Sequence, residues 1–226
     1  MGYRFGLLVF PGVQQLDLTG PYEIFAAAPG AEVHLISKSR APLAASSGLM
    51  LQPTASFADC PKLDLLCVPG GSGVDALMED AETLDFIRAS APELRYLTSV
   101  CTGALVLGAA GLLQGRRAAT HWNARHLLAS FGATPDAGRV VRDGTLITAG
   151  GVTSGIDFGL AVVAEIHGRA EAERIQLYLE YAPAPPFAAG RPEEAPPEVL
   201  AAAQAALAPG RRAREAIVAR LTASTG

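Results

Sequence analysis

The chain has 226 residues, of which half are apolar and only 18% are charged, so its composition excludes a disordered protein and suits one globular domain. Its formal net charge of −4 is small and excludes a whole-molecule field that would recruit nucleic acid or an anionic membrane as a partner. No secretory signal is visible, and nowhere do about 18 apolar residues run without a charge or a turn.

Short apolar runs alternate with longer stretches of helical periodicity, which is typical of an α/β fold with a mostly parallel sheet and helices on both faces. The predicted strands are Tyr3–Phe10, Val33–Ser37, Leu63–Val68, Tyr96–Val100 and Thr145–Thr148. The predicted helices are Gln14–Ala28, Gly73–Ser90, Thr102–Leu113, Asn123–Phe131, Ser154–His167 and Ala170–Leu179. Pro21 lies inside the first of these helices and predicts a start or a kink there.

The clearest hairpin signal is Asp143-Gly144, which has β-branched residues on both sides and supplies the positive φ values that a tight turn needs. It predicts two antiparallel strands within 140–147. A second strand pair is expected around Ala44–Ala55.

The chain changes character after Tyr181, where a proline-rich segment interrupts the helical pattern. An alanine-rich helix, Glu198–Ala208, is expected to end at Pro209-Gly210, before a basic helix, Arg211–Leu221. This tail is too short for a domain. We therefore expect a catalytic domain over residues 1–187, with residues 188–226 as its helical C-terminal extension. The basic residues of the tail are interpreted as a solvated helix face; they are Arg211, Arg212, Arg214 and Arg220.

Cys101 directly follows the strand that ends at Val100 and precedes a helix, so it occupies a sharp strand-to-helix turn. Such a turn holds a nucleophile clear of the sheet, and the free N–H groups of the helix N-terminus favour thiolate over thiol. Cys101 is therefore a candidate nucleophile. The alternative from position alone is a small buried apolar residue.

Two other segments end at the same edge of the predicted sheet. The strand at Leu63–Val68 ends in Pro69-Gly70-Gly71-Ser72-Gly73, and such a turn aims backbone N–H groups at developing negative charge. Asp17 follows the first strand among apolar neighbours. Burial near a thiolate would raise the pKa of its carboxyl, which could then exchange protons with Cys101; the alternative is a helix cap.

The other two cysteines are weaker candidates. Cys67 lies in an apolar strand and is expected to be a core residue, and Cys60 is expected to be a thiol in a loop without a role. His121 could line a pocket, although packing or capping is the simpler role. Three cysteines without paired spacing predict no disulfide framework and a cytoplasmic location, and no motif predicts a metal site.

These residues resemble the ThiJ/PfpI superfamily, which shares the glycine-rich turn, the Ser99-Val100-Cys101-Thr102-Gly103 elbow and an acidic residue after the first strand. Three further segments are similar to the isonitrile hydratase group of that superfamily; they are 14–21, Thr120-His121-Trp122 and 179–187. The resemblance implies a flavodoxin-like three-layer sandwich, similar to class I glutamine amidotransferases, and a homodimer.

The resemblance also implies a cofactor-free hydratase whose partners are a small-molecule isonitrile and water. Cys101 would attack the terminal carbon of the isonitrile to form a thioimidate, and Asp17 would move protons and activate water. Thr102, Gly71 and Ser72 would position the sulfur and the intermediate.

Thr102 occupies the position where protease-like relatives carry a histidine, which disfavours peptidase activity. A helix-turn-helix module, which some relatives carry, has no room within these 226 residues. Two alternatives stay open. The same thiol and carboxyl could serve a glyoxalase-like or deglycase-like enzyme acting on reactive aldehydes, or Cys101 could be the oxidisable thiol of a redox sensor.

Overall fold

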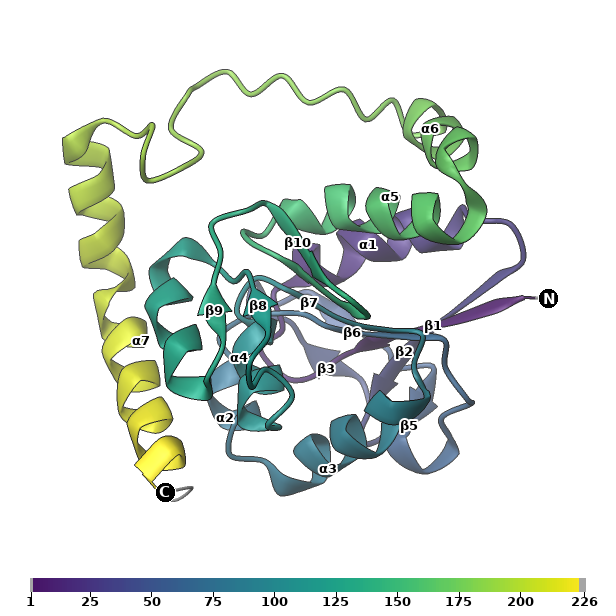
Figure 1. The fold of residues 1–226 in the computed structure, drawn as a ribbon, viewed down its shortest axis with the longest axis horizontal. Coiled ribbons are helices and arrows are strands. Elements are labelled where there is room, and N and C mark those ends of the chain that lie inside the picture. The colour runs from purple at the N-terminus through teal and green to yellow at the C-terminus, as the bar shows by residue number, and fades with distance from the viewer. Residues whose placement is uncertain (1, 224–226) are drawn as a thin grey trace.

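A computed structural model of the chain describes residues 2–223 (Figure 1). Its centre is a seven-stranded sheet in the order β10-β11-β7-β6-β1-β2-β5, in which every neighbouring pair is parallel except β10 with β11. The strands are β1 (Tyr3–Leu8), β2 (Ala31–Ser37), β5 (Ala55–Ser56), β6 (Leu65–Val68), β7 (Tyr96–Val100), β10 (Val140–Asp143) and β11 (Leu146–Ala149). All residues of β6 and β7 are buried, because helices cover both faces of the sheet.

Helices form a layer on each side of this sheet (Figure 1). One layer holds α1 (Gln15–Ala26), α5 (Ser154–His167) and α6 (Arg169–Tyr178), and the other holds α2 (Val74–Leu77), α3 (Ala81–Ser90) and α4 (Gly103–Ala109). The predicted α/β three-layer sandwich is thereby confirmed. Helix α1 runs through Pro21 and does not start there.

Two predicted helices are shorter than expected. The stretch Gly73–Ser90 is broken into α2 and α3 because Asp80 has an extended backbone, accepts from the Thr83 hydroxyl at 2.5 Å and pairs with Lys38 at 2.7 Å. The helix expected to reach Leu113 ends at Ala109, and Gly111 with a φ of 78° follows. The helix predicted over Asn123–Phe131 is a 3₁₀ helix, η3 (Trp122–Phe131). Two short 3₁₀ helices that were not predicted are η1 (Phe57–Asp59) and η2 (Ala91–Glu93).

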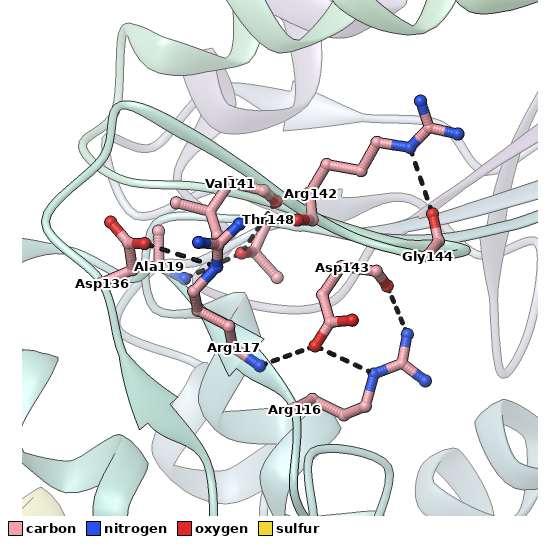
Figure 2. Close-up of polar contacts among 9 residues, drawn as sticks. All are labelled: Arg116, Arg117, Ala119, Asp136, Val141, Arg142, Asp143, Gly144 and Thr148. Atoms are coloured by element: carbon pink, nitrogen blue, oxygen red, sulfur yellow. Dashed lines mark hydrogen bonds and ion pairs between the residues drawn. The ribbon is translucent and has the colours of Figure 1, made fainter.

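The hairpin of β10 and β11 confirms the Asp143-Gly144 signal and anchors the segment that precedes the site (Figure 2). Asp143 accepts from the Arg117 N–H at 2.8 Å and pairs with Arg116 at 3.4 Å. Thr148 Oγ1 accepts from the Ala119 N–H at 2.8 Å. These bonds fix residues 116–119 along the hairpin, so that the next two residues reach the carboxyl end of β7.

Two small sheets accompany the main one. The strand pair expected around Ala44–Ala55 is β3 (Leu43–Ala44) with β4 (Met50–Leu51), while β5 joins the edge of the main sheet. A parallel pair, β8 (Arg117–Ala118) and β9 (Thr134–Pro135), had no signal in the sequence.

The tail differs from the prediction of two helices. One helix, α7 (Pro197–Ala223), runs through Pro209 and Gly210 and packs along η3 and α2. The solvated face expected for its arginines is present only in part, because Arg212 and Arg220 are exposed whereas the side chain of Arg214 is 11% exposed and pairs with Asp75 at 2.7 Å. Arg220 also pairs with Glu79 at 2.7 Å. Within residues 2–223, no helix has the length and apolar character needed to cross a membrane.

Candidate active site

Cys101 lies between the end of β7 and the start of α4, as the strand-to-helix pattern predicts. Its φ of 56° is in the left-handed region, which a non-glycine residue adopts only when its surroundings impose it. The Cys101 N–H donates to the Ala149 carbonyl at 3.0 Å, and the Cys101 carbonyl accepts from the Thr120 hydroxyl at 2.7 Å. Bonds on both sides therefore hold the strained turn in place.

Gly103 allows the first turn of α4 to lie against the end of β6. A Cβ atom at this position would be 1.9 Å from the Val68 carbonyl oxygen. Only a residue without a side chain permits this approach, which fixes the thiol above the edge of the sheet.

The Asp17 carboxyl is fully buried beside the thiol, as expected for a site at the carboxyl ends of β1, β6 and β7. Its Oδ2 accepts from the Gly70 N–H at 2.9 Å, and its Oδ1 has no hydrogen-bond partner of good geometry among residues 2–223. Burial raises the pKa of the Asp17 carboxyl from 3.8 to about 7, against the lowering effects of hydrogen bonds from Gly70 and the Cys101 thiol.

The thiol itself is also buried, with 6% of Cys101 exposed. Burial first, and the negative charge of Asp17 second, raise the pKa of the Cys101 thiol well above its ordinary value, although hydrogen bonds from the Thr102 N–H and hydroxyl lower it. The Thr102 N–H thus acts on the thiol pKa in the predicted direction, but burial and Asp17 outweigh it, so the net shift is opposite to the prediction. The thiol lies among polar groups, however, and Asp17 is in reach to take its proton.

Thr102, Gly71 and Ser72 are found at this site in different roles. The Thr102 hydroxyl accepts from the Gly71 N–H at 3.2 Å and donates to the Cys101 sulfur, so Gly71 acts on the sulfur through Thr102. The Ser72 hydroxyl donates to the Gly12 carbonyl at 3.3 Å.

Sequence reasoning missed two groups of this site. It noted the glycine-rich turn but not that Gly70 supplies the donor to Asp17; a Cβ at Gly70 would be 2.6 Å from Thr102 and 2.8 Å from the carboxyl. It named Thr120 only as part of a family-like segment and gave it no role, because its bond to the Cys101 carbonyl has no local signal.

The thiol opens into a cavity of about 300 Å³, hereafter the Cys101 pocket. Gly71, Thr102, His121 and Val152 line one part of it. Helix α7 contributes Leu207, Gly210, Arg211 and Arg214, which the sequence did not place near the site.

His121 both caps η3 and faces this pocket. Its Nδ1 accepts from the Asn123 N–H at 3.4 Å, and burial, Arg214 and Arg125 lower its pKa, so the imidazole is neutral at pH 7. The capping role that the sequence favoured is thus present together with the pocket position.

A larger cavity of about 580 Å³ lies beside Phe10, Lys38 and Phe57. Its described walls hold neither cysteine nor histidine, so the reactive groups single out the smaller pocket. Among residues 2–223, no three His, Cys, Asp or Glu side chains are grouped so that they could hold a metal ion. Cys67 is fully buried, as predicted, and Cys60 is partly exposed in a loop.

Comparison with known proteins gives one matching family, one similar enzyme and two similar structures. Residues 4–165 match the DJ-1/PfpI family. The chain is 55% identical to isonitrile hydratase of Pseudomonas putida over 99% of this chain and 98% of that protein. It also superposes on a ThiJ/PfpI family protein of Pseudomonas syringae with a TM-score of 0.94 and 44% identity, covering 96% of this chain and 91% of the other. DJ-1beta of Drosophila melanogaster, 22% identical over 81% of this chain and 100% of the other with a TM-score of 0.73, shares the fold.

Proposed function

The chain belongs to the DJ-1/PfpI family, and we propose that it is an isonitrile hydratase, which adds water to an organic isonitrile and releases an N-substituted formamide. Identity of 55% along nearly the whole length of the Pseudomonas putida enzyme supports this activity. We assign the nucleophile to Cys101 and the proton transfers to Asp17, which share the Cys101 pocket.

One observation carries the proposal: the thiol is coupled to a buried carboxyl whose pKa is about 7. A carboxyl of ordinary pKa is a poor proton donor at neutral pH, whereas one that titrates near pH 7 both accepts and donates protons. Hydration of an isonitrile needs a nucleophile, a proton for carbon and a proton for nitrogen. This pair supplies all three requirements without a metal ion.

In the first step, the Cys101 sulfur attacks the terminal carbon of R–NC, and the thiol proton is transferred to that same carbon through the Asp17 carboxyl. One S–C bond and one C–H bond form while the S–H bond breaks, and the product is the thioimidate R–N=CH–S–Cys101. Asp17 receives one proton and returns one, so its protonation state is unchanged. The Thr102 N–H and hydroxyl stabilise negative charge on the sulfur as the proton leaves.

In the second step, water adds across the C=N bond. Its oxygen bonds to carbon, and its proton reaches nitrogen through Asp17, which gives R–NH–CH(OH)–S–Cys101. The C–S bond then breaks, the hydroxyl proton returns to sulfur through Asp17, and R–NH–CHO leaves. The thiol is regenerated, and the net reaction consumes one isonitrile and one water.

The test is an assay of purified protein with an aryl isonitrile, in which the N-aryl formamide is measured by chromatography. We expect formation of the formamide to vanish in Cys101→Ala and to fall by about 10²–10⁴-fold in Asp17→Asn. Cys60→Ala is the matched control, because that thiol lies in a loop outside the Cys101 pocket, and it should keep full activity.

Absence of formamide from the wild type would refute the proposal. Turnover of methylglyoxal but not of the isonitrile would identify an aldehyde-converting enzyme instead. Oxidation of Cys101 without turnover of either compound would identify a redox sensor.

We further propose that the protein acts as a cytoplasmic homodimer in which residues 188–226 are an extension of the catalytic domain of residues 1–187. Three free cysteines support a reducing compartment, and the exposed apolar side chains of Leu49 and Met50 (48% and 61% exposed) support burial against a second copy. Light scattering of the purified protein should give twice the mass of the chain, and a monomeric mass would refute the dimer. Fractionation of cells should recover the protein with the cytoplasmic fraction.

A further inference from the structure

Helix α7 contains two residues that are unfavourable in the interior of a helix. Pro209 and Gly210 lie side by side near the middle of a helix that spans Pro197–Ala223. Relative to alanine, an interior proline costs about 3 kcal/mol and an interior glycine about 1 kcal/mol of helix stability. The helix nevertheless continues through both, so the position of Gly210 needs an explanation other than helix formation.

Gly210 faces the Cys101 pocket. It lines the same 300 Å³ cavity as the thiol, and a Cβ atom at this position would meet no other atom within 4 Å. Gly210 is itself exposed, so its missing side chain leaves open space at the exposed rim of this cavity instead of permitting contact between two segments. Leu207, one turn earlier in α7, and Val152, after β11, add apolar surface to the same cavity.

The helix is fixed close to this position. Arg214, with 11% of its side chain exposed, pairs with Asp75 at 2.7 Å, and Glu215 pairs with His126 at 2.9 Å. Val218 is 1% exposed. With these contacts starting one turn after Gly210, α7 cannot easily move away from a side chain added at that position.

We propose that Gly210 is a specificity-determining position, at which the absence of a side chain makes room for aryl and branched alkyl substituents of the isonitrile. The inference rests on the proposed hydratase function and names its substrate class. The size agrees, because a cavity of about 150 Å³ holds a benzene molecule, and the Cys101 pocket has about twice that volume. A substituent on the isonitrile would lie between Val152 and Leu207 while its terminal carbon meets the sulfur.

The test compares Gly210→Leu with Ala206→Leu, a control that adds the same side chain to an exposed position of α7 outside the pocket. We expect kcat/KM for an aryl isonitrile to fall by about 10–100-fold in Gly210→Leu, since filling a pocket by a few methylenes has effects of this size. The value for methyl isocyanide should change less than about 3-fold, and Ala206→Leu should match the wild type with both substrates. Equal losses for the two isonitriles, or no loss, would overturn the inference.

A second measurement tests the role of Gly210 separately from the proposed hydratase function. In the Cys60→Ala background, the rate of Cys101 alkylation by iodoacetamide is compared with that by N-phenylmaleimide, a probe that carries an aryl ring. Gly210→Leu should lower the rate with the aryl probe relative to the small one by about 10-fold. If neither the wild type nor any variant hydrates an isonitrile, the proposed function fails, but the ratio of the two alkylation rates still tests the role of Gly210. A ratio that is the same in Gly210→Leu and in the parent protein would refute that role.

Discussion

Replacing Asp17 by asparagine should make the protein more stable above neutral pH while removing most of its activity. The carboxyl is fully buried, and burial raises its pKa to about 7, which means that the folded protein disfavours the ionised form. Between pH 4 and pH 7 the folded state binds more protons than the unfolded state at this residue, so its contribution to stability falls as the pH rises. Above about pH 7 the full cost of the buried charge is present.

The size of that cost follows from the pKa. A pKa of about 7 in place of 3.8 corresponds to roughly 4 kcal/mol at about 1.4 kcal/mol for each pKa unit. Most of it develops between the two pKa values. Between about pH 5.5 and about pH 8.5, the wild type should therefore lose about 2 kcal/mol relative to Asp17→Asn, in which the neutral amide does not titrate.

The assay is urea denaturation of the wild type and of Asp17→Asn at both pH values. At each pH, the unfolding free energy of the variant is subtracted from that of the wild type, and the two differences are compared. Groups that do not interact with Asp17 titrate equally in both proteins, so their contributions cancel. A difference that stays constant to within about 0.5 kcal/mol, or that grows in favour of the wild type at high pH, would refute the reasoning. Formamide formation by Asp17→Asn, measured in parallel, should be about 10²–10⁴-fold slower than that by the wild type.

Three further predictions concern the same turn. Gly103→Ala should lose at least about 2 kcal/mol of unfolding free energy in urea denaturation, because its Cβ would overlap the Val68 carbonyl; a loss below about 0.5 kcal/mol would contradict this account of the turn. Thr102→Val should lower kcat by about 10-fold through loss of the hydroxyl that donates to sulfur, while Thr102→Ser retains activity, and equal rates in both would exclude the role of the hydroxyl. Alkylation of Cys101 at about pH 8 should be faster in Asp17→Asn than in the wild type, because removing the carboxylate charge lowers the thiol pKa; a slower reaction would be inconsistent with the coupling.

The fold and the pairing of Cys101 with Asp17 were predictable from the sequence for a definite reason. Buried parallel strands leave continuous apolar runs, and the ends of neighbouring strands meet at one edge of the sheet. The order β7-β6-β1 brings the segments after these three strands together, so Cys101, the glycine-rich turn and Asp17 meet as predicted.

The protonation of the thiol and the course of α7 were not predictable in the same way. Local sequence shows the donors of the turn at Thr102, but desolvation depends on how deeply the packed domain buries Cys101. Pro209-Gly210 is a strong stop signal, yet contacts with residues more than a hundred positions away in sequence, such as that of Arg214 with Asp75 in α2, hold the helix in place. Propensity yields to tertiary packing in that case.

The thiol and the pocket wall come from different parts of the chain, the turn at Cys101 and helix α7, and this separation affects how substrate preference can change. In the proposed mechanism, bond making depends on the strained turn at Cys101, whereas one side of the pocket around it comes from α7, which is joined by a largely exposed segment. Substitutions in α7 can change which substrates fit the Cys101 pocket without changing the turn at Cys101. Exchanging tails between homologous proteins is therefore a direct route to new substrate preferences on an unchanged reaction centre.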